Sequence, residues 1–203
     1  MFTGLIREMA TVVSFSNNIL TLKAKYAPKI GDSIAINGAC LTAVKIGKGT
    51  FSVELSPESQ KTLAMENYKG KVHMEPAMMM GDRFEGHIVQ GHVDCIGVVK
   101  SIKNNGNSVD FFIKIPSEFL RYAIPKGSVT IDGVSLTINE VLKDSFRLTI
   151  IPHTVNNTLF KDYKVNSKVN VETDMFARYI FNMFKGKDDN LTWDKVDNIM
   201  ASY

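Results

Sequence analysis

Residues 31–42, GDSIAINGACLT, return as residues 126–137, KGSVTIDGVSLT. The two stretches share a serine, a glycine and a Leu-Thr pair in the same frame, so that Gly38 corresponds to Gly133. They differ at Cys40, whose counterpart is Ser135. A repeated segment that keeps its frame and changes its reactive side chain indicates two similar molecules that are handled in two different roles.

The duplication extends over most of the chain. Further matching pairs are 51–57 with 146–152, 71–75 with 168–172, and 3–4 with 90–91. The shift between copies changes only across turn regions, as loop insertions in a tandem duplication would produce. Two copies are too few for a solenoid, and two compact domains of roughly 85–95 residues fit the usual domain size. We expect domains at 1–84 and 85–173 and a separate C-terminal segment at 174–203.

The pattern within each copy predicts an all-β fold. Short segments rich in Val, Ile, Thr and Phe occur at 8–15, 33–37, 40–46, 51–56, 71–75, 92–102, 108–115, 128–132, 135–141, 146–151 and 168–172. Glycine and asparagine turns separate them, which indicates an antiparallel sandwich or barrel. A small closed barrel in each copy is favoured because closure removes exposed strand edges.

The last thirty residues have a helical pattern instead. An apolar face on the first predicted helix carries Met175, Tyr179, Ile180, Met183 and Phe184. Thr192 could cap a second helix with Trp193, Val196, Ile199 and Met200 on its apolar side. This segment lies outside the duplication, so neither barrel needs it to close. It either packs on its own barrel or joins copies of the chain.

Composition is that of an ordinary globular protein. Of the 203 residues 44% are hydrophobic, and the formal net charge is only +3 with the charges interspersed, which argues against nucleic acid or a membrane surface as a partner. No segment reads as a signal peptide or reaches transmembrane length. The two cysteines, Cys40 and Cys95, have neither a disulfide pattern nor metal spacing. We therefore expect the reducing cytoplasm and no metal.

Several polar residues are candidates for a site. Cys40 and Ser135 each follow a glycine that allows close approach of a ligand, although a lone cysteine beside a strand is commonly a small buried hydrophobe. His87 and His92 are five residues apart without further metal ligands, so they are either structural or proton-handling groups. Asp174 has no acidic counterpart in the first copy, and it could equally cap the helix that follows.

Five segments together resemble the alpha-chain type of riboflavin synthase. They are MFTGLI at 1–6, NGACLT at 37–42, GHIVQGHVD at 86–94, IDGVSLT at 131–137 and IPHT at 151–154. The resemblance covers both copies. It implies two six-stranded antiparallel Greek-key barrels, a C-terminal helix and a homotrimer, and it suggests lumazine synthase as an associated protein. It also implies a reaction without cofactor: two 6,7-dimethyl-8-ribityllumazine molecules exchange a four-carbon unit, giving riboflavin and 5-amino-6-ribitylamino-uracil.

The resemblance also assigns positions to the site. In the first barrel, substrate-binding positions fall on Gly4, Leu5, Ile6, Cys40, Leu41, Thr42, Glu54, Leu55, Ser56, Pro57, Glu58 and Ser59. In the second barrel they fall on Gly91, His92, Val93, Lys126, Ser135, Leu136, Thr137, Thr149, Ile150, Ile151, Pro152, His153 and Thr154. The catalytic candidates are Phe2, Cys40, His92, Ser135, Thr137 and Asp174.

The chain departs from the common family pattern at a few loop positions, namely Glu85, Gln90, Cys95 and Asn157. These departures bear on loop contacts more than on the reaction. The alternative function is a non-catalytic carrier or antenna protein that binds a lumazine or flavin on the same double barrel. Such carriers tend to lose site residues from one copy, whereas both turns are intact here. A tandem-barrel nucleic-acid binder would need basic stripes with exposed aromatics, which the sequence lacks.

Overall fold

The first copy forms a closed six-stranded antiparallel barrel. The computed structural model describes residues 1–185. The strands of this barrel are β1 (Glu8–Ser16), β2 (Ile19–Lys23), β3 (Ser33–Ile36), β4 (Ala39–Gly47), β5 (Thr50–Glu54) and β6 (Lys71–Pro76). Around the barrel they follow the order β1-β2-β5-β4-β3-β6, and β6 closes it by pairing with both β1 and β3.

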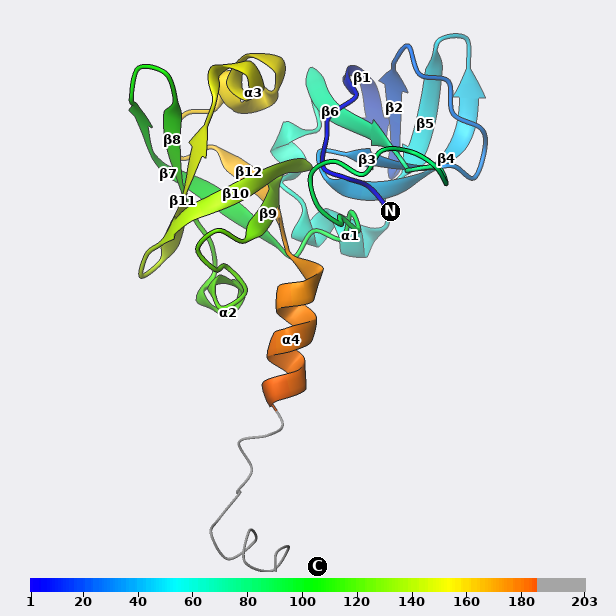
Figure 1. Cartoon of the computed structure of the whole chain (residues 1–203). Coiled ribbons are helices and arrows are strands. Elements are labelled where there is room, and N and C mark those ends of the chain that lie inside the picture. Colours follow the sequence, from blue (N-terminus) through cyan, green and yellow to red (C-terminus); the bar gives the residue numbers. More distant parts are fainter. Residues whose placement is uncertain (186–203) are drawn as a thin grey trace, which may run out of the picture.

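The second copy repeats this barrel strand for strand (Figure 1). Its strands are β7 (Cys95–Asn104), β8 (Val109–Lys114), β9 (Ser128–Ile131), β10 (Val134–Val141), β11 (Ser145–Ile150) and β12 (Lys168–Thr173). Their order, β7-β8-β11-β10-β9-β12, is that of the first barrel, and β12 closes the circle. The expected all-β fold of two six-stranded barrels is confirmed.

Short helices fill the connections. They are α1 (Pro57–Thr62), a 3₁₀ turn at Met65–Asn67, α2 (Ser117–Leu120), α3 (Pro152–Asn157) and a 3₁₀ turn at Leu159–Asp162. The sequence analysis missed α1 and α3, although each begins with a proline, which is favoured at the first helical position. It also missed β2, which follows the two-residue turn Asn17-Asn18 with positive φ at both positions.

The predicted strand 92–102 begins too early. The structure starts β7 at Cys95, because the backbone of the preceding residues is engaged elsewhere. His92 donates its backbone N–H to the Glu172 carboxylate, and Asp94 donates its own to the carbonyl O of Val171. The connection that runs from Ala77 to Asp94, which contains the expected boundary after residue 84, thus ends in a loop held by β12.

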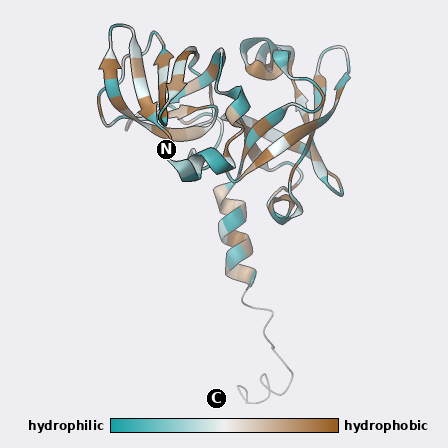
Figure 2. Cartoon of the chain, turned by 180° about the vertical axis from the view of Figure 1, so that it is seen from behind, coloured by the Kyte–Doolittle hydropathy of each residue, from teal (hydrophilic) through white to brown (hydrophobic). Residues whose placement is uncertain are grey.

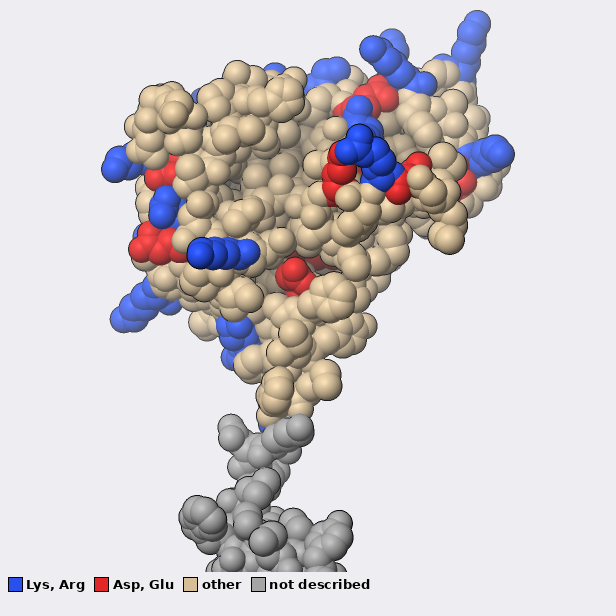
Figure 3. All heavy atoms as spheres, viewed as in Figure 1, with Lys and Arg blue, Asp and Glu red and all other residues tan. Residues whose placement is uncertain are grey.

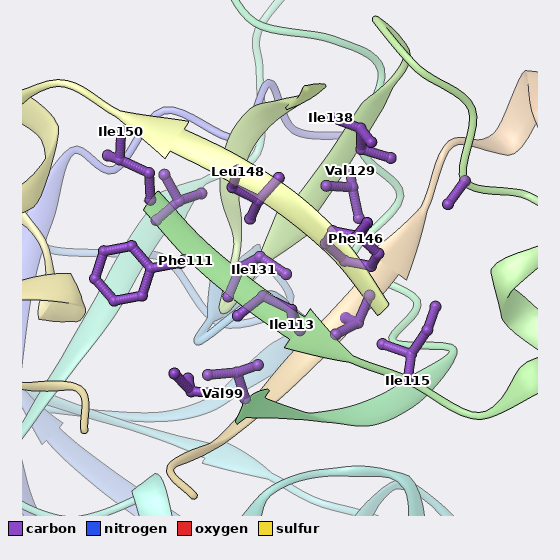
Figure 4. Packing of buried hydrophobic residues seen from close by; sticks show 14 of the residues in the cluster. Val99, Phe111, Ile113, Ile115, Val129, Ile131, Ile138, Phe146, Leu148 and Ile150 are labelled. Atoms are coloured by element: carbon purple, nitrogen blue, oxygen red, sulfur yellow. The ribbon is translucent and has the colours of Figure 1, made fainter. Parts of the chain in front are cut away.

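Each barrel encloses its own apolar core. Figure 4 shows that of the second barrel, where Val99, Phe111, Ile113, Val129, Ile131, Phe146 and Leu148 point inward from successive strands. The first barrel has the same arrangement, with a core built around Leu20, Leu22, Ile34, Phe51, Val53 and Met74. Inward-facing residues alternate with outward-facing ones along the strands, as expected of a small filled barrel. Two separate cores are consistent with two domains.

The two barrels touch through a pair of matching turns. The turn Asn37-Gly38 joins β3 to β4, and Asp132-Gly133 joins β9 to β10. A Cβ atom on Gly38 would lie 2.7 Å from the backbone N of Gly133, and a Cβ atom on Gly133 would lie 2.9 Å from the backbone N of Gly38. Both glycines have positive φ, 81° and 82°. Glycine alone suits this conformation and this approach. The repeated glycine therefore allows the two domains to touch at these turns.

A buried histidine reaches across this contact from the first barrel. His73, on β6, lies 2.8 Å through Nδ1 from the carbonyl O of Asp132, and its Nε2 lies 2.8 Å from the backbone N of Leu159. Since a carbonyl only accepts and an N–H only donates, Nδ1 carries the proton and the ring is neutral. Burial lowers the pKa of His73 to about 4.

An asparagine makes the corresponding contacts from the second barrel. Asn170, on β12, donates Nδ2–H to the carbonyl O of Asn37 and accepts the backbone N–H of Ala64 through Oδ1, each at 2.8 Å. One side chain in each copy therefore presents one donor and one acceptor to the other copy. An amide does this without a titratable group, whereas His73 does it only while neutral.

The helix α4 (Met175–Lys185) extends away from both barrels (Figure 1). It shows alternating hydrophilic and hydrophobic bands (Figure 2). Its large side chains Phe176, Tyr179, Ile180 and Met183 are more than half exposed. Phe181 packs edge-on against Tyr122 with ring centroids 5.4 Å apart. The second helix expected from Thr192 lies outside the described residues. No helix within 1–185 is long and apolar enough to cross a membrane.

The neutral His73 predicts a specific loss of stability in acid. Its pKa lies near 4 in the folded chain and near 6.5 when unfolded, so only the unfolded state takes up a proton between these values. The free energy of unfolding is therefore independent of the protonation of His73 above about pH 6.5. It falls by about 3 kcal/mol as the pH falls from there towards 4. His73→Asn, which copies Asn170, should remove this part of the pH dependence in urea unfolding.

The exposed His153 provides a control for this measurement. His153→Asn should leave the pH dependence of the unfolding free energy as in the unmodified chain. Equal pH dependence in His73→Asn and the unmodified chain would contradict the neutral, interface-spanning assignment of His73.

Candidate functional site

The segments that precede the two barrels are exchanged between them. Phe2 and Val89 pair in an antiparallel bridge, with N···O distances of 2.8 and 3.1 Å. Beyond this bridge, the carbonyl O of Gly4 accepts the backbone N–H of Ser135 at 2.7 Å, and that of Gly91 accepts the N–H of Cys40 at 2.8 Å. Each turn that carries a reactive side chain therefore lies against the leading segment of the other copy.

Glycine is required where each segment meets the turn. A Cβ atom on Gly4 would lie 2.6 Å from Cβ of Ser135, and one on Gly91 would lie 2.6 Å from Cβ of Cys40. Contacts this short do not occur between real Cβ atoms, so a side chain at either position would push the two strands apart. The glycines thereby bring the backbone of one copy directly beside the Cys40 thiol or the Ser135 hydroxyl of the other.

A buried glutamate anchors each exchanged segment. Glu75, at the end of β6, accepts the backbone N–H groups of Thr3 and Gly4 and the Thr3 hydroxyl. Glu172, at the end of β12, accepts three backbone N–H groups from the segment Gln90-Gly-His92 at 2.7, 2.9 and 3.1 Å. Burial raises the pKa of Glu75, and it raises that of Glu172 to about 7, while the backbone donors oppose the shift in both.

A pocket of about 210 Å³ opens beside Cys40. It is lined by Ala39, Cys40, Leu41, Glu58, Ser59, Thr62, Leu63, Gly91, His92 and Val93. The first barrel supplies the floor through β4, one wall comes from α1, and the exchanged segment supplies the opposite wall. Val93 also packs against the core of the first barrel, so this wall is fixed to the barrel that it covers.

The corresponding place in the second barrel brings a histidine onto Ser135. His87 Nδ1 lies 2.7 Å from Ser135 Oγ. Burial lowers the pKa of His87, and the nearby charge of Asp174 opposes that shift. A neutral imidazole beside a serine hydroxyl can take up or return a proton. Ile6, from the exchanged segment, packs against the core of the second barrel.

Sequence reasoning missed the pairing of Ser135 with His87 because it favoured His92. His92 is exposed in the Cys40 pocket. The spacing of five residues carried the signal. His87 contacts Ser135 and His92 lines the Cys40 pocket, while Val89, between them, forms the bridge with Phe2.

The grouping of site residues by barrel was wrong in one respect. The positions Gly4–Ile6 adjoin Ser135 of the second barrel, and Gly91–Val93 adjoin Cys40 of the first. The sequence analysis had assigned each segment to the barrel that follows it in the chain. The exchange follows from the contact of the two turns, which turns each barrel's open end towards the other copy's leading segment.

The remaining candidates divide into supporting and exposed positions. Those that belong to the barrel cores are Leu41, Leu55, Leu136 and Ile150. Those at the start of the two short helices are Ser56, Pro57, Ile151, Pro152, His153 and Thr154, with Ser56 accepting the backbone N–H of Ser59. Those exposed on strands or turns are Thr42, Glu54, Lys126 and Thr137. Thr149 is engaged by the Asp110 carboxylate at 2.6 Å. Phe2 is fully buried between the two copies.

Asp174 has the role of a helix cap in addition to its place beside His87. Its Oδ1 accepts the backbone N–H of Phe176 at 2.8 Å, immediately before α4. The expected helix cap at Asp174 is therefore confirmed. The charge of Asp174 also raises the pKa of His87, against the larger effect of burial.

Charged residues do not form a single-sign surface on the face drawn in Figure 3. Lys and Arg mix with Asp and Glu, mostly towards the margins of the face in Figure 3, with a broad uncharged surface between them. Within residues 1–185, no group of three or more His, Cys, Asp or Glu could hold a metal ion. Within the same residues, the Cys40 pocket has a single acidic residue, Glu58, in its lining beside neutral and hydrogen-bonding groups.

Comparisons with known proteins agree with the repeat. The model of the lumazine binding domain matches residues 3–77 and again 90–174. The riboflavin synthase of Photobacterium phosphoreum is 44% identical over 89% of this chain and 87% of its own length. That of Bacillus subtilis (strain 168) is 36% identical over 100% of this chain and 98% of its own length.

Solved structures share the fold. LumP complexed with riboflavin superimposes with a TM-score of 0.75 at 20% identity, over 86% of this chain and 100% of that one. LumP complexed with 6,7-dimethyl-8-(1'-D-ribityl) lumazine has a TM-score of 0.72 at 21% identity, over 86% of this chain and 99% of that one.

The two cysteines should differ in reactivity. Cys40 is half-buried and faces the pocket, whereas Cys95 is buried, and burial raises the pKa of its thiol to about 12. With a thiol reagent such as DTNB at about pH 8, one thiol per native chain should react, and the second only after unfolding. Cys40→Ser should abolish the native reaction. If both thiols of the native chain reacted with DTNB at the same rate, the assignment of Cys40 to an open pocket would be contradicted.

Proposed function

This chain belongs to the riboflavin synthase family, and we propose that it catalyses the dismutation of 6,7-dimethyl-8-ribityllumazine to riboflavin. One observation carries the proposal. The chain has two equivalent places, each made from a turn of one copy and the leading segment of the other. One offers the Cys40 thiol, and the other offers the Ser135 hydroxyl hydrogen-bonded to His87. Such a pair suits one compound used twice, in two roles.

The proposed reaction needs no external oxidant or reductant. One lumazine gives up a four-carbon unit and becomes 5-amino-6-ribitylamino-uracil, while the other receives the unit and becomes riboflavin. The donor must lose a proton from its 7-methyl group, and the acceptor must be activated at the neighbouring ring carbon. The protein's main contribution is to hold the two rings in register, with proton transfer as a smaller one.

We assign the proton transfer at the second place to Ser135 together with His87. Because burial lowers its pKa, His87 is neutral near pH 7 and can accept the proton of the Ser135 hydroxyl. The exposed Thr137, two residues further along β10, is proposed to bind the same ring. Asp174 acts on His87 through its charge.

At the first place, we propose that Cys40 and His92 contact the other ring. Both line the pocket that α1 closes on one side, and Glu58 and Ser59 add polar groups there. Phe2 is proposed to position both places, because its bridge with Val89 joins the two exchanged segments.

The proposed assembly is a homotrimer joined through α4. The helix extends from the barrels and exposes a row of large apolar side chains, and exposed apolar patches of this kind mark protein–protein interaction sites. In such a trimer, the two rings of one reaction lie in the Cys40 place of one subunit and the Ser135 place of a neighbouring subunit. We also propose a cytoplasmic location, which suits two free cysteines. The association with lumazine synthase stays a prediction of the family resemblance.

The activity is tested by incubating the purified chain with the ribityllumazine. Riboflavin should form, and Ser135→Ala should lower kcat by roughly 100-fold or more because it removes the hydroxyl beside His87. The same change should cost only about 1 kcal/mol of stability, since it removes a single side-chain hydrogen bond. Ser101→Ala, at an exposed position on β7, is the control that should change neither.

Two outcomes would contradict these proposals. Binding of the lumazine without riboflavin formation would favour the carrier function. Parallel losses of activity and stability in Ser135→Ala would make Ser135 structural rather than catalytic.

The trimer is tested at Ile180, which is 55% exposed on α4. Ile180→Asp should convert the trimer to monomers in sedimentation, because a buried unpaired carboxylate opposes association. Ile30→Asp introduces the same change at a 72% exposed position between β2 and β3, and it should leave the trimer intact. A monomeric unmodified chain at micromolar concentration would refute the proposed assembly.

A further inference from the structure

An arginine of α4 holds the segment that walls the Cys40 pocket. Arg178 donates from Nη1 to the Asp94 carboxylate and from Nη2 to the Gln90 side-chain oxygen, both at 2.7 Å. The two partners lie at the two ends of the short stretch Gly91–Val93, whose three residues line the pocket. The planar guanidinium presents its two donors in a fixed fork, so it sets the spacing between the ends of this wall.

The same stretch is held from its other side by β12. Glu172 accepts the backbone N–H groups of Gln90, Gly91 and His92. Asp94 Oδ2 accepts both the backbone N–H and the hydroxyl of Thr173, at 2.7 and 2.6 Å. The wall is therefore clamped between a strand of the second barrel and the first turns of α4, although the pocket it covers belongs to the first barrel.

Charge makes Arg178 hard to replace. Asp94 is mostly buried, with 10% of its side chain exposed, and Glu172 is buried beside it. Burial raises the pKa of Glu172, the positive charge of Arg178 opposes this shift, and the negative charge of Asp94 adds to it. Without the guanidinium, two neighbouring buried carboxylates would lack a cation, which is costly.

The first copy does not have this clamp. The counterpart of Gln90 is Thr3, whose hydroxyl binds the anchoring Glu75 directly. The counterpart of Asp94 is Arg7, and no helix equivalent to α4 follows β6. The link to a helix is thus confined to the segment that covers Cys40, and Gln90 makes half of it.

We propose that Arg178 is a positioning residue: through Gln90 and Asp94 it fixes the Gly91–Val93 wall of the lumazine pocket to α4. The proposal rests on the function proposed above for this pocket. Because α4 also carries the exposed apolar face proposed to join subunits, the wall is set by the element that assembles the trimer.

The test compares Arg178→Met, Arg178→Lys and Gln90→Ala with the unmodified chain. A loosened wall should raise the KM for the lumazine about tenfold in Arg178→Met, with a smaller change in kcat, and it should speed the reaction of Cys40 with DTNB by a similar factor. Arg178→Lys keeps the charge but loses the two-donor guanidinium. Its KM and its Cys40 reaction rate should therefore lie between those of the unmodified chain and of Arg178→Met. Gln90→Ala removes one arm and should give a smaller change of the same kind.

Lys100→Met is the matched control. It breaks the Lys100–Asp144 ion pair, which is 2.8 Å long and lies in the second barrel away from the pocket. It should alter neither KM nor the Cys40 rate. If Arg178→Met does not fold, Arg178→Lys and Gln90→Ala carry the test.

The rate at which Cys40 reacts with DTNB tests the role of Arg178 independently of the proposed activity. If the unmodified chain makes no riboflavin, the proposed function fails, and the DTNB rates still decide whether Arg178 holds the wall. Unchanged Cys40 rates in Arg178→Met, Arg178→Lys and Gln90→Ala would overturn the proposal. So would a loss of activity in Arg178→Met that follows dissociation of the trimer while the Cys40 rate stays the same.

Discussion

The whole arrangement depends on the close approach of two glycine turns. Gly38 and Gly133 come so near that a Cβ atom on either would collide with the backbone of the other. This approach lets His73 and Asn170 each reach the backbone of the opposite copy, and both side chains are buried there. With the turns fixed in this way, the segment that leads into each barrel lies beside the other barrel's reactive turn.

Exchange of the leading segments explains how a duplicated domain can acquire two roles. Both places keep the same backbone frame: a glycine carbonyl of the exchanged segment that accepts the backbone N–H of the turn, and a glutamate that anchors this segment. The side chains differ, with Cys40 and His92 in one and Ser135 and His87 in the other. Under the proposed function, equivalent frames suit one compound at both places, and different side chains give it two roles.

The repeated segments were sufficient to predict two barrels and to single out Cys40 and Ser135. A strand alternation and a glycine turn are local signals, and both survive in a single sequence. The missed features are not local. That His87 rather than His92 contacts Ser135, and that Gly4 lies against the turn of the second barrel, both follow from how the barrels dock. Docking depends on surface shape, which leaves no periodic pattern. The clue was present in Gly4 and Gly91, since matching glycines ahead of each barrel indicate close backbone contact there.

The exchanged architecture is tested most directly by a crystal structure of the chain with bound 6,7-dimethyl-8-ribityllumazine. The account predicts one ring between Cys40 and the Gly91–Val93 segment and a second ring between Ser135 and the Gly4–Ile6 segment. A ring held by the turn of one barrel together with that same barrel's own leading segment would contradict it, as would a single ring bound away from both turns.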